Sequence, residues 1–369
     1  MTLRRSALSA AATLAVLALA STACTVKSSD GPAATGSAPA AGSSPTKAGG
    51  AGTAELADGS GTKVALVPGG AHPYFQPWKQ TGIDTGKSLK LGDVAFDETA
   101  EWDQQKQNNL LSTLAARGYN AFGVFGVSPT DINTTFADLK SQGFAVASLA
   151  SCPAGGRNEA DFCLSTDVEL AAYKAAQAAI EAMGGKGALV HVTGNNVDAN
   201  TRLRMKGVEK AVKETGGKVT LLQTITDIDK DLQTAQKAVS DLLAAKGAQI
   251  QGIVSTAYNP AVAAAEAVRE SGSKAKVVAI DDDAKILSSI KDGSVSATVV
   301  QNPVGQADIG TWALALLQSK QCTMAKPGQI VDSGSFVVTK ANVGTYDEAR
   351  KAKTAELKKQ FADTYLSCG

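Results

Sequence analysis

Short apolar segments alternate with longer amphipathic segments along most of the chain. The apolar segments have the length and the content of Val, Ile and Ala that are typical of buried strands. They cover residues 63–67, 91–96, 121–124, 145–149, 187–192, 218–223, 251–255, 275–280, 296–300 and 329–338. The amphipathic segments predict helices that start near Trp78 and over 100–116, 131–141, 168–183, 200–215, 230–245, 260–270, 284–291, 305–317 and 345–365. Strands that alternate with helices predict parallel sheets, and there are too many strands for one ordinary sheet, so we expect two similar α/β lobes.

The first 23 residues have the pattern of a secretory signal. Arg4 and Arg5 precede an apolar segment over 8–20, and small residues then lead to Cys24. A cysteine after small residues resembles a bacterial lipoprotein cleavage site, although Ser21 stands where lipoproteins usually carry Leu. We therefore expect Cys24 to be lipidated and to hold the protein at the outer face of the cell membrane, with ordinary signal cleavage as the alternative.

Residues 24–61 predict a flexible tether. The segment is mostly Gly, Ala, Ser, Thr and Pro, and it has almost no large apolar side chain with which to build a core. The folded body is expected to begin near Thr62.

Four cysteines remain when Cys24 is set aside, and an even number in an exported chain indicates disulfides. They are Cys152, Cys163, Cys322 and Cys368, which allow three pairings. Pairing Cys152 with Cys163 would close a small loop, and Cys322 with Cys368 would then tie the C-terminal tail to the body.

Composition excludes several classes of function. The formal charge is +1, and it becomes −1 if Arg4 and Arg5 leave with the signal, so there is no basic field for nucleic acid. His72 and His191 are the only histidines, and no cluster has the spacing of a metal site. We find no nucleophile elbow, phosphate loop or dinucleotide fingerprint. The pattern favours a binding protein that has no catalytic activity and needs no cofactor or metal.

The loop after the first predicted strand is rich in rings. His72, Tyr74, Phe75 and Trp78 fall within seven residues, whereas aromatic residues make up 5% of the chain. Such a loop follows the carboxyl end of a strand, where α/β proteins bind ligands. Flat rings beside hydrogen-bonding groups suit a sugar. The alternative is that Tyr74 and Phe75 cap the core and Trp78 packs under the first helix.

Several short motifs recur in the order found in one family of binding proteins. They are His72-Pro73-Tyr74-Phe75, Asp103 with Gln107, Ser128-Pro129-Thr130-Asp131, Ser165-Thr166-Asp167, Arg204-Met205-Lys206-Gly207-Val208, Ile280-Asp281-Asp282, Lys291-Asp292-Gly293 and Gln301-Asn302-Pro303. From Thr62 to about Val343 the chain resembles the periplasmic sugar-binding proteins of ABC importers, of the ribose-binding-protein-like type. No single motif is specific, but their order and spacing over most of the body are.

The resemblance implies the type I periplasmic binding protein fold, with two doubly wound parallel-sheet lobes joined by three crossovers. It divides the chain into an N-terminal lobe of residues 62–166 plus 302–334 and a C-terminal lobe of residues 167–301 plus 335–369, the second of which includes the helical tail. The ligand would lie in the cleft between the lobes. A monomer would close around it and dock on an ABC permease.

The resemblance also implies a set of ligand contacts. Each residue type has a physical reason to bind a hydroxylated guest, since guanidinium donates, carboxylate accepts, amides do both and rings cover C–H faces. The predicted ligand-binding residues are His72, Tyr74, Phe75, Ser128, Arg204, Asn259, Asp281 and Gln301. The alternatives are that Asp281, Asn259 and Ser128 only help to start helices and that Arg204 is a solvated charge.

One departure bears on the identity of the ligand. After the fourth strand many family members carry an acidic residue followed by Arg or Ser, but here the chain reads Leu149-Ala150-Ser151-Cys152. A carboxylate acceptor is therefore missing, and His72 adds a titratable ring in place of Asn. The expected ligand is a sugar or polyol that is not held in the usual way of ribose.

The sequence thus predicts a lipid-anchored solute-binding protein that delivers a sugar or polyol to an ABC importer. Two alternatives stay open, a sensor that presents a bound sugar to a receptor and a secreted enzyme that acts on glycans. The signal and the tether stand where a cytoplasmic repressor of the same fold would carry its DNA-binding headpiece.

Overall fold

The computed structural model describes residues 54–369. The signal segment 1–23, Cys24 and the tether up to residue 53 lie outside the described residues. All described residues belong to one compact unit, in which two six-stranded sheets each form the centre of a lobe.

The first sheet has the strand order β12-β5-β4-β3-β1-β2, and its paired strands are all parallel. Its strands are β1 (Lys63–Val67), β2 (Asp93–Phe96), β3 (Ala121–Val124), β4 (Ala145–Leu149), β5 (Phe162–Ser165) and β12 (Gln329–Asp332). The order reverses at β1, which is the arrangement of a doubly wound sheet.

The second sheet repeats the same order as β13-β10-β9-β8-β6-β7. Its strands are β6 (Gly187–Val192), β7 (Val219–Ile225), β8 (Gly252–Ser255), β9 (Lys276–Ile280), β10 (Ala297–Val300) and β13 (Phe336–Thr339). Only the edge strand β13 is antiparallel, to β10, among these pairs. The expectation of two doubly wound α/β lobes is confirmed.

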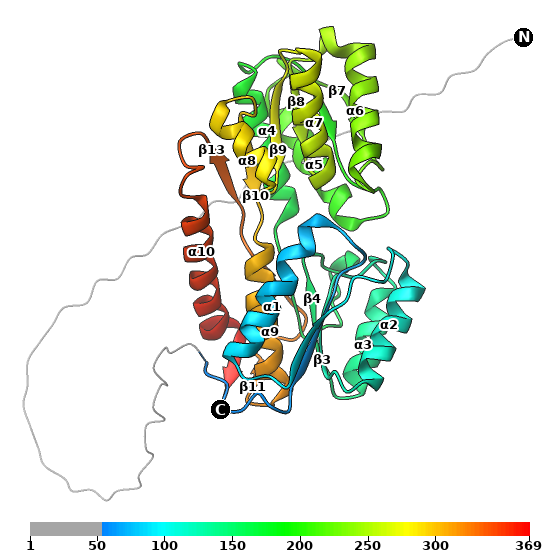
Figure 1. The fold of residues 1–369 in the computed structure, drawn as a ribbon, viewed down its shortest axis with the longest axis vertical. Helices are drawn as coiled ribbons and strands as arrows, with labels where there is room; N and C mark the ends of the chain where they lie inside the picture. Colours follow the sequence, from blue (N-terminus) through cyan, green and yellow to red (C-terminus); the bar gives the residue numbers. More distant parts are fainter. Residues whose placement is uncertain (1–53) are drawn as a thin grey trace, which may run out of the picture. The chain divides into compact units, whose positions relative to one another are not determined.

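Helices cover both faces of each sheet (Figure 1). In the first lobe they are α1 (Gln76–Ser88), α2 (Gln104–Ala116), α3 (Ile132–Ser141) and α9 (Pro303–Gln318). In the second lobe they are α4 (Val168–Ala182), α5 (Ala199–Glu214), α6 (Leu232–Lys246), α7 (Tyr258–Ser271) and α8 (Ala284–Asp292). Three short 3-10 segments are η1 (Pro73–Phe75), η2 (Ala154–Gly156) and η3 (Gly247–Gln249), and η4 (Phe361–Tyr365) is a π-helical segment near the C-terminus. Among the described residues, none of the helices combines the length and the apolar character that a bilayer crossing requires.

Alternate residues of each central strand enter opposite cores, as the pleat requires. Val64 and Leu66 of β1 pack with α1 and α9, whereas Ala65 and Val67 pack with α2 and α3. All four side chains are fully buried. A strand buried on both faces has a continuous apolar sequence, which explains why the sequence located β1, β3 and β4. The predicted strands miss β5, which is equally buried but short and interrupted by Cys163 and Ser165.

Three short crossovers connect the lobes. They lie between β5 and α4, between β10 and α9, and between β12 and β13. The predicted single strand over 329–338 is therefore wrong, because residues 333–335 carry the chain from one sheet to the other. Ser333 of the third crossover shares a 3.1 Å hydrogen bond with Thr166 Oγ1 of the first, and its Oγ accepts another from Gln306 Nε2, in the first turn of α9, at 3.1 Å.

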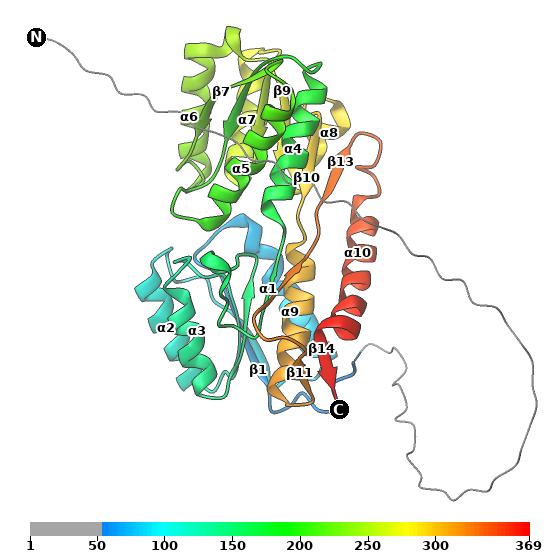
Figure 2. The same cartoon turned by 180° about the vertical axis from the view of Figure 1, so that it is seen from behind.

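The C-terminal tail contacts both lobes (Figures 1 and 2). Tyr346, at the start of α10 (Tyr346–Gln360), packs against the second-lobe core, whereas Leu357 and Phe361 belong to the first-lobe core. Beyond it, β14 (Leu366–Cys368) pairs with β11 (Cys322–Met324), where a disulfide joins Cys322 to Cys368. The assignment of the whole tail to the second lobe needs correction, because its apolar end is buried in the first.

The folded body also begins earlier than the sequence suggested. Leu56 packs against the first-lobe core, and the carbonyl of Ala54 accepts a hydrogen bond from Trp312 Nε1 at 3.1 Å. Residues 54–61 are thus part of the first lobe and not of a tether. Leu56 is the single large apolar side chain of this segment, and its partial burial against the core holds the segment on the first lobe.

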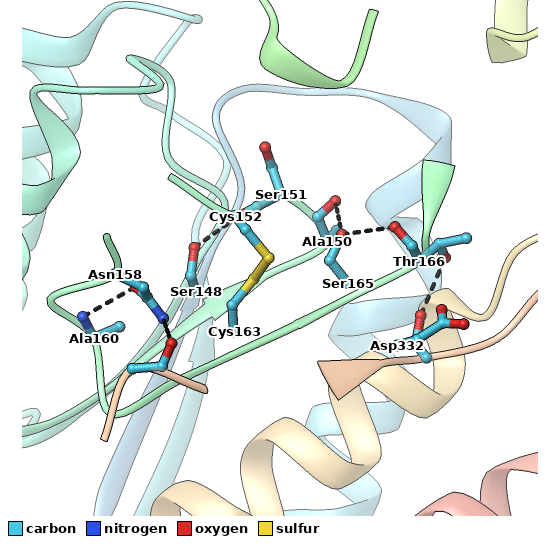
Figure 3. The surroundings of a disulfide bond; sticks show 12 residues. Ser148, Ala150, Ser151, Cys152, Asn158, Ala160, Cys163, Ser165, Thr166 and Asp332 are labelled. Atoms are coloured by element: carbon cyan, nitrogen blue, oxygen red, sulfur yellow. Dashed lines mark hydrogen bonds between the residues drawn. A yellow bond between two sulfur atoms is a disulfide. The ribbon is translucent and has the colours of Figure 1, made fainter. Parts of the chain in front are cut away.

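The second disulfide joins Cys152 to Cys163 (Figure 3). It ties the loop after β4 to β5, the strand that leads into the first crossover. Of the three pairings that the sequence allowed, the structure therefore has the one that closes the small loop and ties down the tail.

Gly207 allows α5 to lie closely against α4. A Cβ at this position would collide with the carbonyl oxygen of Glu169 and would stand 2.9 Å from the backbone nitrogen of Tyr173. The glycine of the motif 204–208 thus has a packing role.

We predict that Gly207→Ala lowers the free energy of unfolding by about 1–3 kcal/mol, because two backbones must separate to admit the methyl group. Denaturant unfolding measures this, with Gly344→Ala as control, since no atom lies within 4 Å of a Cβ there. Equal unfolding midpoints for the two variants would contradict the packing role.

Candidate functional site

A cavity of about 380 Å³ lies between the two lobes. Its walls are loops and helix starts that follow the carboxyl ends of strands in both sheets, where doubly wound folds place their ligands. The lining residues of the first lobe are His72, Tyr74, Phe75, Glu101, Trp102, Phe125, Val127 and Ala150. Those of the second lobe and its crossover are Gly194, Asn195, Val197, Asp198, Asn200, Arg204, Asp227, Asp229, Lys230, Tyr258, Asp281 and Gln301.

The first-lobe wall is aromatic. Phe75 is 5.2 Å from Phe125 between ring centroids and 6.3 Å from Trp102, and Trp102 is 5.9 Å from Phe125. Tyr74 packs edge-on against Phe75 and donates its hydroxyl to Gln306 Oε1 at 2.9 Å. Burial raises the pKa of Tyr74, and the nearby carboxyl of Asp281 adds to the rise. This wall offers ring surfaces and a neutral phenol.

His72 links this wall to the second lobe. Its Nδ1 accepts a hydrogen bond from the backbone nitrogen of Tyr74 at 3.2 Å, which caps the turn η1. Its Nε2 stands 3.4 Å from Asp229 Oδ2, close enough for an ion pair if the ring is protonated but not aligned as a hydrogen bond. Its ring centroid is 5.8 Å from that of Tyr258. The ring therefore lies between the lobes.

Arg204 reaches the cavity from α5, in the second lobe. Its Nε is buried and has no hydrogen-bond partner within the described part of the chain. A buried donor without a partner is costly, and the cost is removed when an acceptor occupies the cavity. The solvated-charge interpretation of Arg204 does not fit this burial.

Asp281 and Gln301 lie at the ends of β9 and β10. Gln301 Nε2 donates to Asp281 Oδ1 at 2.8 Å, and both side chains are buried. Burial raises the pKa of Asp281 to about 7, although the Gln301 bond and Arg204 oppose the shift. Asp281 also has a positive φ of 66°, an uncommon conformation for Asp that tends to be kept where a side chain must be aimed.

Two predicted contacts are not on the cavity wall. Ser128 Oγ accepts from the backbone nitrogen of Asp131 at 3.1 Å, so it shapes the turn before α3. Asn259 instead fastens the neighbouring loop, since its backbone nitrogen donates to Asp229 Oδ1 at 2.9 Å. The other six predicted residues line the cavity together. Ser128 and Asn259 thus lie outside the cavity lining, and the hydrogen bonds given above shape the starts of α3 and α7.

Other residues weighed from the sequence are structural. Trp78 belongs to the first turn of α1 and is fully buried, with its ring centroid 5.0 Å from that of Phe75, so it is a core residue. Thr166 bonds within the hinge. His191 is fully buried and shares a 2.7 Å hydrogen bond with Thr256 Oγ1, and burial lowers its pKa to about 3, with a smaller effect from Arg204.

The motif Asp103 with Gln107 has a supporting role. Asp103 caps α2 by accepting from the backbone nitrogen of Lys106 at 2.8 Å. Gln107 is buried and bonds the loop after β3, through the carbonyl of Phe125 at 2.8 Å and the nitrogen of Val127 at 3.1 Å. The motif therefore places Phe125 without touching the cavity itself.

Sequence reasoning missed several wall residues. The main ones are Trp102, Phe125, Asp198, Asn200, Asp229 and Tyr258. Each follows the carboxyl end of a predicted strand, and that position was the signal that could have found them. Burial raises the pKa of Asp198, which caps α5. Within residues 54–369 no three His, Cys, Asp or Glu side chains gather as metal ligands would.

Ala150 stands where the resemblance had led us to expect an acidic residue. Its carbonyl accepts from Ser165 Oγ at 2.9 Å and from Asn200 Nδ2, across the cleft, at 3.2 Å (Figure 3 shows the first of these). The missing carboxylate is thus replaced by a backbone acceptor that is used within the protein. A guest must find its acceptors elsewhere, and Asp281 and Asp229 are on the opposite wall.

Comparisons with known proteins agree with this geometry. Residues 64–321 match the sequence model of the periplasmic binding protein domain. The chain is 24% identical to the D-allose-binding periplasmic protein of Escherichia coli K12 over 271 residues, 71% of this chain and 83% of that protein. It is 26% identical to the ribose import binding protein RbsB of Bacillus subtilis over 234 residues, 63% of this chain and 73% of that protein.

A solved structure is also similar in fold. It is an ABC transporter solute binding protein from Burkholderia graminis in complex with D-arabinose, with a TM-score of 0.70 and 23% sequence identity over 78% of this chain and 99% of that one.

Because the pKa of Asp281 is raised, we expect the stability of the protein to depend on pH. In the unfolded chain this carboxyl ionises near its ordinary value of 3.8, but in the folded protein only near 7. The folded state therefore binds more protons between these values, and stability falls as pH rises through this window. Asp281→Asn removes the effect, so it should melt above wild type at pH 8 and close to wild type below pH 4.

Thermal unfolding at both pH values tests this, with Asp138→Asn on the exposed surface of α3 as control. A stabilisation by Asp281→Asn that does not change with pH would contradict the desolvation argument.

Proposed function

The chain belongs to the periplasmic binding protein family, and from this premise we propose that it is an extracytoplasmic solute-binding protein that captures a sugar or polyol. The guest occupies the cavity between the lobes and is delivered to an ABC importer. The two relatives compared above are named as binding proteins for D-allose and for ribose import, and not as enzymes. Accordingly, the proposal contains no catalytic step.

The observation that carries the proposal is the meeting of Arg204, Asp281 and Phe75 around one cavity. They come from both lobes and combine a donor fork, a carboxylate acceptor and a ring surface. This set matches a molecule with hydroxyl edges and C–H faces. The volume of about 380 Å³ also lies within the usual range of small-molecule sites, roughly 300–1,000 Å³.

Each wall has its own part in holding the guest. Arg204 donates to ring or hydroxyl oxygens, and its buried Nε, which has no partner within the described part of the chain, gains one. Asp281 and Gln301 bind neighbouring hydroxyls as a bonded pair. His72 and Tyr74 add polar contacts next to the face of Phe75. Asn259 contributes through Asp229, which it holds in place.

Delivery rests on closure of the lobes. Asn200 donates to Ala150 and His72 faces Asp229, both between lobes, so these contacts form only when the lobes are close together. A guest that bridges the same walls favours the closed state, and the closed state docks on the permease. The hinge of three crossovers divides the body near residues 166, 302 and 334.

The anchor is proposed from the sequence. The signal segment 1–23 ends directly before Cys24, and lipidation of Cys24 would hold a monomeric body at the outer face of the cell membrane. No other membrane contact is needed for the role.

A thermal-shift screen tests the substrate class. A ligand that binds only the folded protein raises the melting temperature by mass action, about 2.7 kcal/mol of stabilisation at one hundred times Kd. We expect at least one of D-allose, D-ribose, D-arabinose or a related polyol to raise it. If no member of a broad panel of sugars and polyols does so, the substrate class is wrong.

Arg204 gives a sharper test with the sugar found. Arg204→Ala should weaken its binding about 10- to 100-fold, because a charge-assisted hydrogen bond contributes about 1.5–3 kcal/mol. Titration calorimetry measures this, and Arg202→Ala, on the same helix outside the cavity lining, is the matched control. Equal affinities for the two variants would remove Arg204 from the site.

Cys24→Ser tests the anchor. The wild-type protein should sediment with membranes, whereas the variant should appear in the soluble extracytoplasmic or culture fraction. A variant that still sediments with membranes would show that lipid on Cys24 is not the attachment.

A further inference from the structure

We propose that Trp102 is a stacking platform that makes the cleft select a cyclic sugar over an open-chain polyol. The inference rests on the proposed function and narrows its substrate class. Neither the ring-rich loop 69–78 nor the motifs of the resemblance include this residue. Its exposure, the two glycines that pack against it and its backbone conformation support this role.

Trp102 is an exposed indole in a cavity wall. Its side chain is 44% exposed, whereas those of Trp78 and Trp312 are 0% and 3% exposed. Large aromatic side chains usually bury most of their surface, so an exposed indole beside a cavity is a candidate for ligand contact. Of the three tryptophans of the chain, Trp102 alone borders the cleft.

The indole rests on the backbone of two glycines. A Cβ on Gly69 would stand 2.9 Å from Cε3 and Cζ3 of the six-membered ring. A Cβ on Gly70 would stand 2.7 Å from Cδ1 and Nε1 of the five-membered ring. The two glycines therefore lie beneath the two rings, and only residues without a side chain allow the indole to lie so close. This gives a local reason for the pair of glycines after β1.

The backbone around Trp102 is held in an unusual conformation. Glu101 and Trp102 both have positive φ, 54° and 58°, which side chains of this size rarely adopt. The nitrogen of Trp102 donates to the carbonyl of Gly69 at 2.7 Å and fastens the loop to the end of β1. Strain of this kind persists where surrounding contacts fix it, commonly at ligand sites. The indole is thus preorganised instead of mobile.

Neighbouring rings complete the platform. Phe125 and His72 meet the indole at interplanar angles of 86° and 88°, with centroids 5.9 Å and 6.2 Å away. They support the indole without stacking in parallel on it, and the part of the indole not covered by the glycines contributes to the cavity wall.

A flat indole selects for shape. The C–H groups on one face of a sugar ring form a fixed apolar surface that an indole can cover, whereas an open-chain polyol must first lose rotational freedom to present one. Arg204, Asp281 and Gln301 bind the hydroxyls of either kind of molecule. The difference in affinity between a cyclic sugar and an open-chain polyol therefore depends on Trp102.

The test compares each sugar with its own reduction product, D-ribose with ribitol, D-arabinose with arabinitol and D-allose with allitol. Titration calorimetry measures affinity, and tryptophan emission reports burial of the indole. Wild type should bind a sugar at least about tenfold tighter than its alditol, with emission shifted to shorter wavelength. Trp102→Ala should weaken sugar binding about tenfold, leave alditol binding within about threefold and abolish the emission shift.

Two further variants protect the test against a folding defect. Gly70→Ala keeps the indole but displaces it from the two glycines, so it should weaken sugar binding in the same direction while circular dichroism and cooperative unfolding remain those of a folded protein. Trp312→Phe removes a buried indole away from the cleft and should keep both the affinity and the emission shift. Sugar binding that is unchanged in both Trp102→Ala and Gly70→Ala would overturn the inference while the proposed function stands. If neither sugars nor alditols bind wild type, the proposed function fails, and the inference with it.

Discussion

Parallel strands that end at a shared edge are the constraint on which the rest of this structure depends. Each sheet has the order 2-1-3-4-5 with an added edge strand, and the loops after its strands face the same cleft. In such sheets the connecting helices cover the two faces. The loops at the strand ends take no part in the pairing of strands, so they can carry aromatic or charged side chains. Two lobes built alike thus bring unlike walls together, aromatic from the first and charged from the second.

The charged wall contains polar groups whose burial costs free energy. Arg204 has a buried nitrogen without a partner, and Asp281 is buried enough for its pKa to rise to about 7. Buried polar groups without partners and carboxyls with a raised pKa lower the stability of a fold, and they are found mainly at functional sites. A molecule with hydroxyl groups in the cavity would supply hydrogen-bond partners to Arg204 and Asp281.

The hinge is braced by more than its three crossovers. Helix α10 reaches from the second-lobe core to the first, and Asn302 of the second crossover bonds Thr354 on that helix at 2.9 Å. The disulfide of Cys322 with Cys368 holds the far end of the tail on the first lobe. On the other side of the crossovers, Asp332 Oδ1 accepts from the nitrogen of Asp167 at 2.9 Å. Any movement of the lobes must bend or shift this tail.

The sequence by itself determined most of the alternation of strands and helices and the two lobes, because buried parallel strands leave an apolar pattern that local reading detects. Six of the eight residues that the family resemblance implied as ligand contacts lie on the cavity wall. Only the tertiary structure decided that residues 329–338 divide between two sheets, that the tail ends on the first lobe, and that Trp102 and Asp229 belong to the wall. It also separated Ser128 and Asn259 from Asp281. Serine, asparagine and aspartate shape helix starts and bind ligands with the same atoms, so a local sequence cannot tell the two uses apart. What separates them is which loop reaches across the cleft, and that depends on contacts between residues far apart in the chain.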